Sequence, residues 1–175
     1  LRKALMFEPR GHADMYGCIL VPPNDRSADF GILFLHNEGY STMCGHAIIA
    51  ISKLAVEMAW IDVVVGAIKL KIDAPCGRIN SQVQVRDGKV TDISFQCVPS
   101  FVVALDRQVE LAGYGTLSYD IAYGGAFYAY VDAGQLGLEH TEHNYAEIIE
   151  AGKAIKQAVM ARDEDILHPF EEDLS

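Results

Sequence analysis

The sequence has little positive charge. Its 14 Lys and Arg residues stand against 24 Asp and Glu residues, which gives a formal net charge of −10 at pH 7. An acidic chain is a poor match for nucleic acids and anionic membranes, so neither is expected as a partner. The chain also lacks an uninterrupted run of about 20 apolar residues, the length that a membrane-spanning helix needs. We find no signal-peptide pattern, internal repeat or low-complexity segment, which indicates an ordinary globular protein.

Cysteine is scarce and unclustered. The four cysteines are Cys18, Cys44, Cys76 and Cys97, and no two of them form a C-x-x-C pair. A chain of this size with so few cysteines is no disulfide scaffold, and reduced thiols in the cytoplasm are the simplest interpretation. No group of Cys and His residues has the spacing of a zinc site. Zinc is therefore not expected. We expect no other metal and no cofactor.

Hydrophobic residues, by contrast, make up 50% of the 175 residues, which is enough for a domain with a full core. Alternating or continuous apolar runs predict many short strands, and two longer segments have helical patterns. The expected strands are residues 18–21, 30–36, 63–72, 77–85, 90–98, 101–104, 115–122 and 126–131, and the expected helices are 44–60 and 146–162. Asp87-Gly88 predicts a hairpin turn between two strands. Many strands around one buried helix indicate an α+β domain, expected as a single lobe over residues 1–175.

The most informative segment is residues 37–50, where a cysteine stands at the mouth of a strongly apolar helix. Ser41 and Thr42 before it are typical N-cap residues, and a helix that is apolar on nearly all sides is usually buried. The first turn of a helix offers free N–H groups and a partial positive charge. A thiol there tends towards its thiolate, and a substrate carboxylate can dock on the same groups. Cys44 is thus a candidate base for removing the Cα proton of an amino acid, although a buried structural cysteine fits the local pattern as well.

Several motifs carry a resemblance to the proline racemase family. They are residues 8–12 followed by 14–17, residues 43–46, and residues 120–129, and their order and spacing agree with the family from about residue 5 to residue 131. The resemblance implies one lobe of a diaminopimelate-epimerase-like fold, in which a sheet wraps around a buried central helix. In that fold the active site lies between two lobes.

Within the family, residues 36–40 and 124–128 most resemble the trans-3-hydroxy-L-proline dehydratases, since racemases tend to have Asn where Ala126 stands. This resemblance implies a hydro-lyase that converts trans-3-hydroxy-L-proline to Δ1-pyrroline-2-carboxylate. One alternative is a proline racemase or hydroxyproline 2-epimerase, which uses two cysteines. Another is a lobe that keeps the fold without catalytic activity.

For the dehydratase, the resemblance implies that Cys44 removes the Cα proton. N–H groups near Gly45 and His46 would stabilise the charge that develops on the substrate, although His46 could also be a neutral residue that only belongs to the helix start. Glu38 could help the 3-hydroxyl group to leave, or it could be a solvated loop charge.

Aromatic residues complete the implied site. Phe34 and Tyr16 match family positions where side chains wall the proline ring and exclude water. Tyr16 replaces the Phe that is common in racemases, so its hydroxyl could reach a hydroxylated ring. A plain core role fits either residue equally well.

The other cysteines are expected to have no catalytic part. Cys76 has a motif-like setting between Pro75 and Gly77, but strand-like sequence follows, which favours a structural role. Cys18 and Cys97 are expected to be neither accessible from a cleft nor reactive.

Length sets a further expectation. Full-length family members are about twice as long, and their second half carries the residue that faces the first cysteine. That residue is Cys in racemases and epimerases and commonly Thr in the dehydratases. The chain is therefore expected to hold most of the first lobe, to be inactive alone, and to self-associate, for instance as a homodimer.

Overall fold

The computed structural model describes residues 1–62, 66–162, 166–171 and 174. The chain divides into two compact units, Leu1–Pro99 and Ser100–Ser175. The sequence predicts one lobe with one core, whereas the described residues form two apolar cores that share no residue. Each unit has its own sheet and its own long helix, so each buries apolar side chains within itself. Both units combine helix and sheet, which confirms the predicted α+β class.

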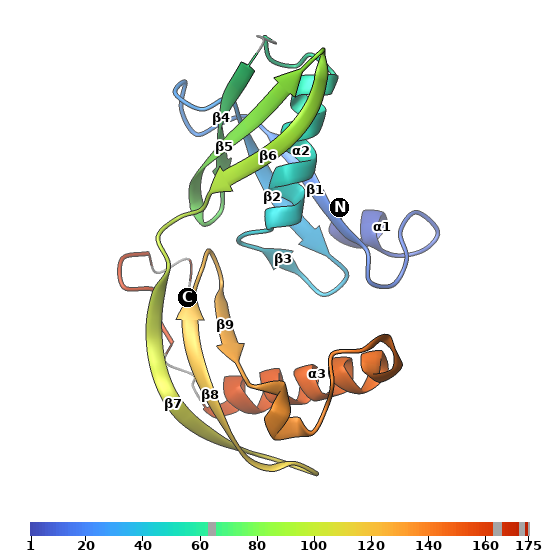
Figure 1. Ribbon diagram of the computed structural model, residues 1–175, viewed down its shortest axis with the longest axis vertical. Coiled ribbons are helices and arrows are strands. Elements are labelled where there is room, and N and C mark those ends of the chain that lie inside the picture. The colour runs from blue at the N-terminus through green and yellow to red at the C-terminus, as the bar shows by residue number, and fades with distance from the viewer. Residues whose placement is uncertain (63–65, 163–165, 172–173, 175) are drawn as a thin grey trace. The chain divides into compact units, whose positions relative to one another are not determined.

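The first unit is a curled sheet with one long helix packed against it (Figure 1). Its strands lie in the order β1-β2-β4-β5-β6, and β3 pairs with β2. The elements are α1 (Arg2–Met6), β1 (Tyr16–Val21), β2 (Phe30–His36), β3 (Tyr40–Ser41), α2 (Gly45–Glu57), β4 (Gly66–Ala74), β5 (Gly77–Arg86) and β6 (Lys89–Gln96). β2 and β4 are parallel, and parallel neighbours need a crossover connection, which α2 provides.

Side chains that alternate along β4 and β5 supply much of the core of the first unit. They pack against the buried residues of α2, which are Ile48, Ile51, Ser52, Ala55 and Val56. The helix is buried along one flank, whereas Ile49 and Leu54 on its other side are 40% and 44% exposed. A pair of buried hydroxyls joins the two layers: Ser52 Oγ donates to Ser81 Oγ at 2.8 Å, and Ser81 Oγ donates to the carbonyl oxygen of Ser94 at 3.3 Å.

The predicted hairpin turn is confirmed between β5 and β6. Asp87 and Gly88 have φ angles of 51° and 73°. Positive φ at both central positions gives the turn a twist that matches the flanking strands, and Asp-Gly tolerates it well.

Other predicted boundaries differ slightly. β2 has the predicted bounds Phe30–His36, but α2 ends at Glu57 rather than near Trp60. The predicted strand 63–72 begins with residues 63–65, which lie outside the described residues, and its remainder is confirmed as part of β4.

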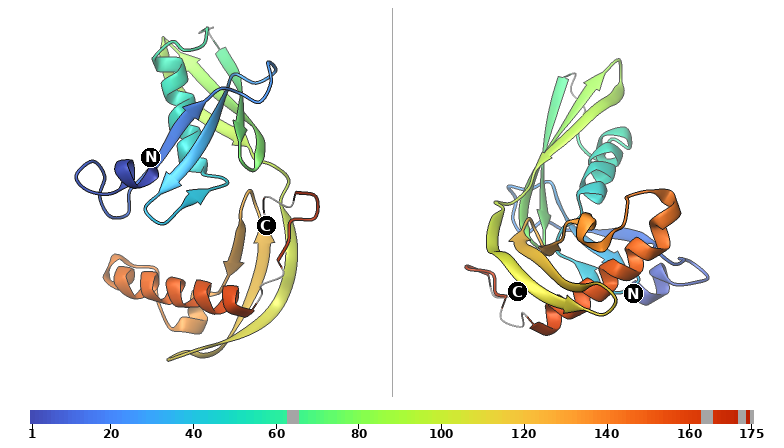
Figure 2. Two further views of the ribbon diagram at one scale, coloured as in Figure 1. Left: turned by 180° about the vertical axis from the view of Figure 1, so that it is seen from behind. Right: turned by 60° about the horizontal axis from the view of Figure 1, so that its bottom comes forward.

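The second unit has three antiparallel strands in the order β7-β8-β9, and α3 packs along one face of them (Figure 2). The elements are β7 (Phe101–Leu111), β8 (Gly115–Tyr123), β9 (Phe127–Tyr130), the short 3₁₀ helices Ala133–Leu136 and Glu142–Asn144, and α3 (Tyr145–Arg162). Ile155 and Val159 of α3 join Leu117, Tyr119 and Ile121 of β8 in the core.

A cavity of about 690 Å³ lies between α3 and the strands β8 and β9. Its lining is mainly apolar and includes Phe127, Leu136 and Ile148, with Lys156 and His140 among the few polar groups. Three strands cover less of a helix than the curled sheet of the first unit, so apolar surface stays open here.

Candidate active site

Cys44 lies at the start of α2. Its backbone is extended, with φ −148° and ψ 107°. Its carbonyl oxygen accepts a helical hydrogen bond from the N–H of Ile48 at 3.1 Å. The N–H groups of residues 45–47 come before this first helical hydrogen bond and so have no acceptor within the helix. Such N–H groups are the donors that a helix start can offer to an anion. A thiol and an anion-binding set of N–H groups thus stand at the same point of the chain.

The segment before Cys44 is held in place by its own contacts. Ser41 Oγ donates to the carbonyl oxygen of Met43 at 2.8 Å, and the carbonyl oxygen of Thr42 accepts from the N–H of Cys76 at 3.1 Å. The predicted capping role of Ser41 or Thr42 is wrong, because the N-cap residue is Cys44 and no side chain caps α2 within the described residues. The helix start is therefore open to a ligand while the chain that leads to it is fixed.

Gly45 and His46 form the first turn of α2 after Cys44. A Cβ atom on Gly45 would stand 3.0 Å from Cζ of Phe95. Glycine thus allows the helix start to approach β6 closely. His46 is exposed and Cys44 is partly exposed, so both can be reached by a small molecule in the described chain.

A row of side chains crosses the sheet beside Cys44. Cys18, Phe34 and Ser41 stand opposite one another on β1, β2 and β3. Directly paired residues of antiparallel strands project to the same face, and Phe34 is buried in the core that includes α2. Cys18 therefore faces the α2 side of the sheet. Partial desolvation of its thiol, and then the nearby Cys44 thiol, raise the pKa of Cys18 above its ordinary value.

The proximity of Cys18 to Cys44 was not anticipated from the sequence. Cys18 is exposed, so its predicted inaccessibility is wrong, and its predicted lack of reactivity stays a prediction. β1 is an edge strand of the sheet, and the residues on it therefore have fewer neighbours to cover them. The pairing register of the strands is the signal that locates Cys18, and a single sequence does not give that register.

Cys76 and Cys97 form a second pair of neighbouring thiols. Cys76 is 6% exposed, and Cys97 packs against the same core. Burial, together with the adjacent Cys97 thiol, raises the pKa of Cys76 to about 12. A thiol that resists ionisation is a poor nucleophile, which supports the structural role predicted for Cys76.

The two aromatic residues predicted for the site have different surroundings. The ring of Tyr16 is partly exposed and stacks on the imidazole of His36 at a centroid distance of 5.5 Å. Tyr16 stands two residues before Cys18 on β1 and thus projects from the same face of the sheet. Phe34 is fully buried. In the described chain, Tyr16 and His36 can meet a ligand, and Phe34 supports the sheet beneath them.

Glu38 lies in the turn between β2 and β3 and is exposed. Its backbone N–H and that of Gly39 donate to Nδ1 of His36 at 3.3 Å and 3.2 Å. Asn37 Nδ2 donates to the carbonyl oxygen of Met6 at 2.8 Å, which fastens the turn to the end of α1. The Glu38 carboxylate is therefore carried by a turn whose backbone is well defined.

Two features do not occur in the part of the chain that the structure describes. Within residues 1–62, 66–162, 166–171 and 174, no group of three His, Cys, Asp or Glu side chains could hold a metal ion. Over the same ranges, no helix has both the length and the apolar character needed to cross a bilayer.

Comparison with known proteins gives consistent relatives. The family model described as proline racemase matches residues 1–175. The chain is 50% identical over 175 residues to a trans-3-hydroxy-L-proline dehydratase of Colwellia psychrerythraea, covering 100% of this chain and 49% of that protein. It is 43% identical over 179 residues to a trans-3-hydroxy-L-proline dehydratase of Homo sapiens, covering 100% of this chain and 50% of that protein. The chain thus spans about half the length of the curated relatives it matches.

Two solved structures share the fold. A hydroxyproline epimerase from Agrobacterium vitis, with bound trans-4-hydroxy-L-proline, gives a TM-score of 0.94 at 30% identity, over 99% of this chain and 50% of that one. A probable proline racemase from Agrobacterium radiobacter K84, with bound carbonate, gives 0.94 at 27% identity, over 99% and 51%. These similarities confirm the fold that the sequence motifs predict.

Proposed function

Because the chain belongs to the proline racemase family, we propose that it forms part of a hydro-lyase that dehydrates trans-3-hydroxy-L-proline to Δ1-pyrroline-2-carboxylate. The observation that carries the proposal is Cys44, a partly exposed thiol at the open start of α2. Identity of 50% to a protein named for this activity supports the choice of substrate.

The reaction begins with removal of the Cα proton. The Cys44 thiolate takes this proton, and the electron pair of the C–H bond stays on Cα and is delocalised into the substrate carboxylate. The carboxylate docks on the N–H groups of residues 45–47, where the helix start stabilises its growing negative charge. Water loss then follows: the electron pair forms a Cα=C3 double bond and the C3–O bond breaks. The resulting enamine tautomerises to the imine.

Glu38 is the candidate acid for the leaving hydroxyl group. A hydroxide ion is a poor leaving group, so proton transfer to the oxygen speeds the step. The carboxyl group of Glu38 belongs to the turn that leads through β3 to Cys44. In this proposal it protonates the 3-hydroxyl group, which departs as water.

His46, Tyr16 and Phe34 complete the proposed site. His46 stands in the first turn of α2 and binds the substrate near its carboxylate. Tyr16 walls one side of the proline ring, and Phe34 supports that wall from the core. Excluding water in this way strengthens the electrostatic interactions on which proton abstraction depends.

A second candidate function is racemisation or epimerisation at Cα. The observation that favours it is the TM-score of 0.94 to structures titled hydroxyproline epimerase and probable proline racemase. That reaction requires a second base to return a proton to the opposite face, whereas dehydration requires only one base.

Proton NMR in D₂O separates the two functions. The complete protein is incubated with trans-3-hydroxy-L-proline, trans-4-hydroxy-L-proline or L-proline. Dehydration removes the C3–H signal of the 3-hydroxy substrate and produces the imine. Epimerisation exchanges the Cα proton for deuterium, inverts that centre and keeps the hydroxyl group. Exchange with inversion and no imine would favour the second function over the first.

Glu38→Gln tests the proposed acid in the same assay. Water loss is expected to slow more than Cα exchange, because the amide cannot donate the proton that the leaving group needs. Glu57→Gln, at the far end of α2, is the matched control and should change neither rate. Equal slowing of both steps by Glu38→Gln would remove Glu38 from the mechanism.

A further inference from the structure

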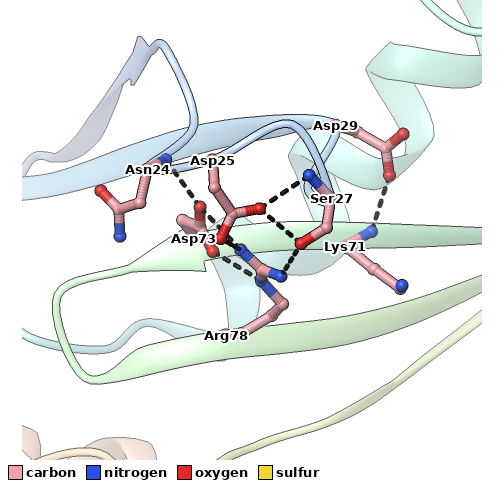
Figure 3. Close-up of polar contacts among 7 residues, drawn as sticks. All are labelled: Asn24, Asp25, Ser27, Asp29, Lys71, Asp73 and Arg78. Atoms are coloured by element: carbon pink, nitrogen blue, oxygen red, sulfur yellow. Dashed lines mark hydrogen bonds and ion pairs between the residues drawn. The ribbon is translucent and has the colours of Figure 1, made fainter.

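Arg78 joins three segments of the first unit in one polar network (Figure 3). Its Nε donates to Asp73 Oδ1 at 2.8 Å, and its Nη2 donates to Asp73 Oδ2 at 3.3 Å. Nη2 also lies 3.1 Å from Asp25 Oδ2, and Nη1 donates to Ser27 Oγ. A planar guanidinium can hold two carboxylates in this way, which a point charge such as an ammonium group cannot.

Asp73 is the buried member of the network, at 7% exposure. Its Oδ2 also accepts from the backbone N–H of Asn24 at 2.8 Å. The hydrogen bond from Arg78 is the main cause that lowers the pKa of Asp73, opposed by desolvation. A buried carboxylate that loses its cationic partner is strongly unfavourable, so removing Arg78 forces Asp73 and its surroundings to rearrange.

Asp73 and Arg78 are paired across the β4–β5 hairpin, one step outside the Ala74–Gly77 pair that closes it. Only two residues, Pro75 and Cys76, lie between that closing pair. The Arg78 network therefore links β4 to β5 at the base of this two-residue turn.

That turn touches the chain that leads to Cys44. The backbone N–H of Cys76 donates to the carbonyl oxygen of Thr42 at 3.1 Å. Thr42 is two residues before Cys44, and Met43 between them is buried. The continuous path from Arg78 thus runs through Asp73, the turn and the Thr42 carbonyl to the start of α2.

We propose that Arg78 is a positioning residue for Cys44: it fixes the β4–β5 turn, and the turn holds the segment that places the thiol at the start of α2. This inference rests on the proposed function insofar as it concerns turnover. Misplacement of a catalytic group by about 1 Å can cost roughly 100-fold in rate, so a loose turn has a measurable consequence even though Arg78 does not touch substrate.

The first test measures turnover by three variants of the complete protein. Arg78→Met removes the charge and keeps much of the stem, and kcat is expected to fall about 10-fold or more with KM within about twofold. Arg78→Lys keeps the charge without the fork and should fall between Met and the wild type. Asp25→Asn is the matched control, because it removes the charge from the exposed contacts of Asp25 with Arg78 and Ser27 and leaves the Asp73–Arg78 pair. Its kcat should stay within about twofold of the wild type.

The second test needs no enzymatic activity. Iodoacetamide alkylation of Cys44 and Cys18 is followed by mass spectrometry in the same folded samples, with circular dichroism and Trp60 fluorescence as checks of folding. Arg78→Met should change the Cys44 rate at least threefold relative to Cys18, and Asp25→Asn should not. If the wild type has no turnover, the proposed function fails while this ratio still tests the positioning. An unchanged ratio in both Arg78 variants, or an equal change in Asp25→Asn, overturns the inference.

Discussion

Each of the two units combines one β-sheet with one long helix, but the surroundings of that helix differ. The first unit wraps five strands and the short β3 around one flank of α2, and it contains all four cysteines and the single tryptophan. The second unit has three strands and α3, and a cavity of about 690 Å³ stays open between them. The helix of the first unit thus packs on a wider sheet, whereas the helix of the second unit borders an open cavity.

The difference shows where a precise site can be placed. In the first unit, the start of α2 is fixed by neighbours on β3, β6 and the β4–β5 turn. In the second unit, α3 is held mainly through Ala151, Ile155 and Val159 along one stripe. A reactive group needs support from several directions to stay in position, and only the first unit supplies it among the described residues.

The largest expected effect tests whether Cys44, in the first unit, is the base that removes the Cα proton. Cys44→Ser in the complete protein should lower kcat/KM about 100-fold or more, because a serine hydroxyl is too weak a base to replace a thiolate. Cys97→Ser is the matched control and should keep most activity. Turnover is measured from imine formation, and the fold is checked by circular dichroism. Retention of a tenth of the wild-type rate would exclude Cys44 as the base.

The second effect compares the two cores. Phe34→Ala should destabilise the first unit by about 3–5 kcal/mol, since a fully buried ring is replaced by a cavity. Leu117→Ala is the counterpart in the second unit, with an expected cost of about 2–5 kcal/mol. Urea unfolding is followed by the fluorescence of Trp60, which lies in the first unit. Only Phe34→Ala should move that transition; an equal shift by Leu117→Ala would mean that the units unfold together.

The third effect is the acid sensitivity of the first unit. The pKa of Asp25 is lowered to about 2, chiefly by hydrogen bonds from Ser27 and also from Arg78, and the pKa of Asp73 is lowered as well. A carboxyl group whose pKa is lower in the folded state adds stability above its unfolded value near 4, and this is lost as the pH falls through the folded value. The free energy of unfolding should therefore decrease from pH 5 towards pH 2.

Variants of the Arg78 network test whether Asp25 and Asp73 cause this loss of stability at low pH. Arg78→Met and Asp25→Asn should each give a shallower decrease in the Trp60 transition over the same pH range. The surface variant Glu57→Gln should leave the slope as it is. A wild-type slope in Arg78→Met would show that other carboxyl groups cause the acid sensitivity.

The smallest effect concerns the open side of α3. Gly152 lines the cavity, and a Cβ atom there would meet no atom within 4 Å. Gly152→Ala should stabilise the second unit by about 0.5–1 kcal/mol, because alanine is the better helix former. Gly137→Ala is the contrasting control, since a φ of 66° strains any side chain. Thermal unfolding by circular dichroism measures both. A loss of stability in Gly152→Ala would show that the space beside it is occupied.

Patterns that depend on near neighbours were predictable from the sequence. The apolar run of β2, the Asp87-Gly88 turn and the helical period of α3 each specify a local structure, and each is confirmed. The sequence predicts a strand that ends at Ala104, whereas β7 continues to Leu111. Its pairing with β8 shifts register twice, and such irregularities disturb the side-chain alternation by which a strand is recognised in a sequence.

Features of the candidate site that depend on distant pairs were not predictable. Cys44 and its helix follow from residues that are adjacent in the chain. The contact of Cys18 with the same region needs the register of β1 against β2, and the Arg78 network joins residues more than 40 positions apart. One sequence contains no information on such pairings beyond residue type, because any exposed loop charge is a possible partner for an arginine.

The Ser52–Ser81 hydrogen bond has a consequence for where α2 stands along its own axis. Hydrophobic burial is not directional, so apolar contacts specify the position of a helix along its own axis less sharply than a hydrogen bond does. A shift by one residue, about 1.5 Å, would separate these two hydroxyls inside the core. Ser81 would keep its hydrogen bond to the Ser94 carbonyl, but Ser52 would lose its partner, and a buried unpaired group costs about 1–3 kcal/mol. The Ser52–Ser81 hydrogen bond thus fixes the position of α2 along its axis. A contact in the middle of the helix therefore helps to determine where the Cys44 thiol lies relative to the sheet.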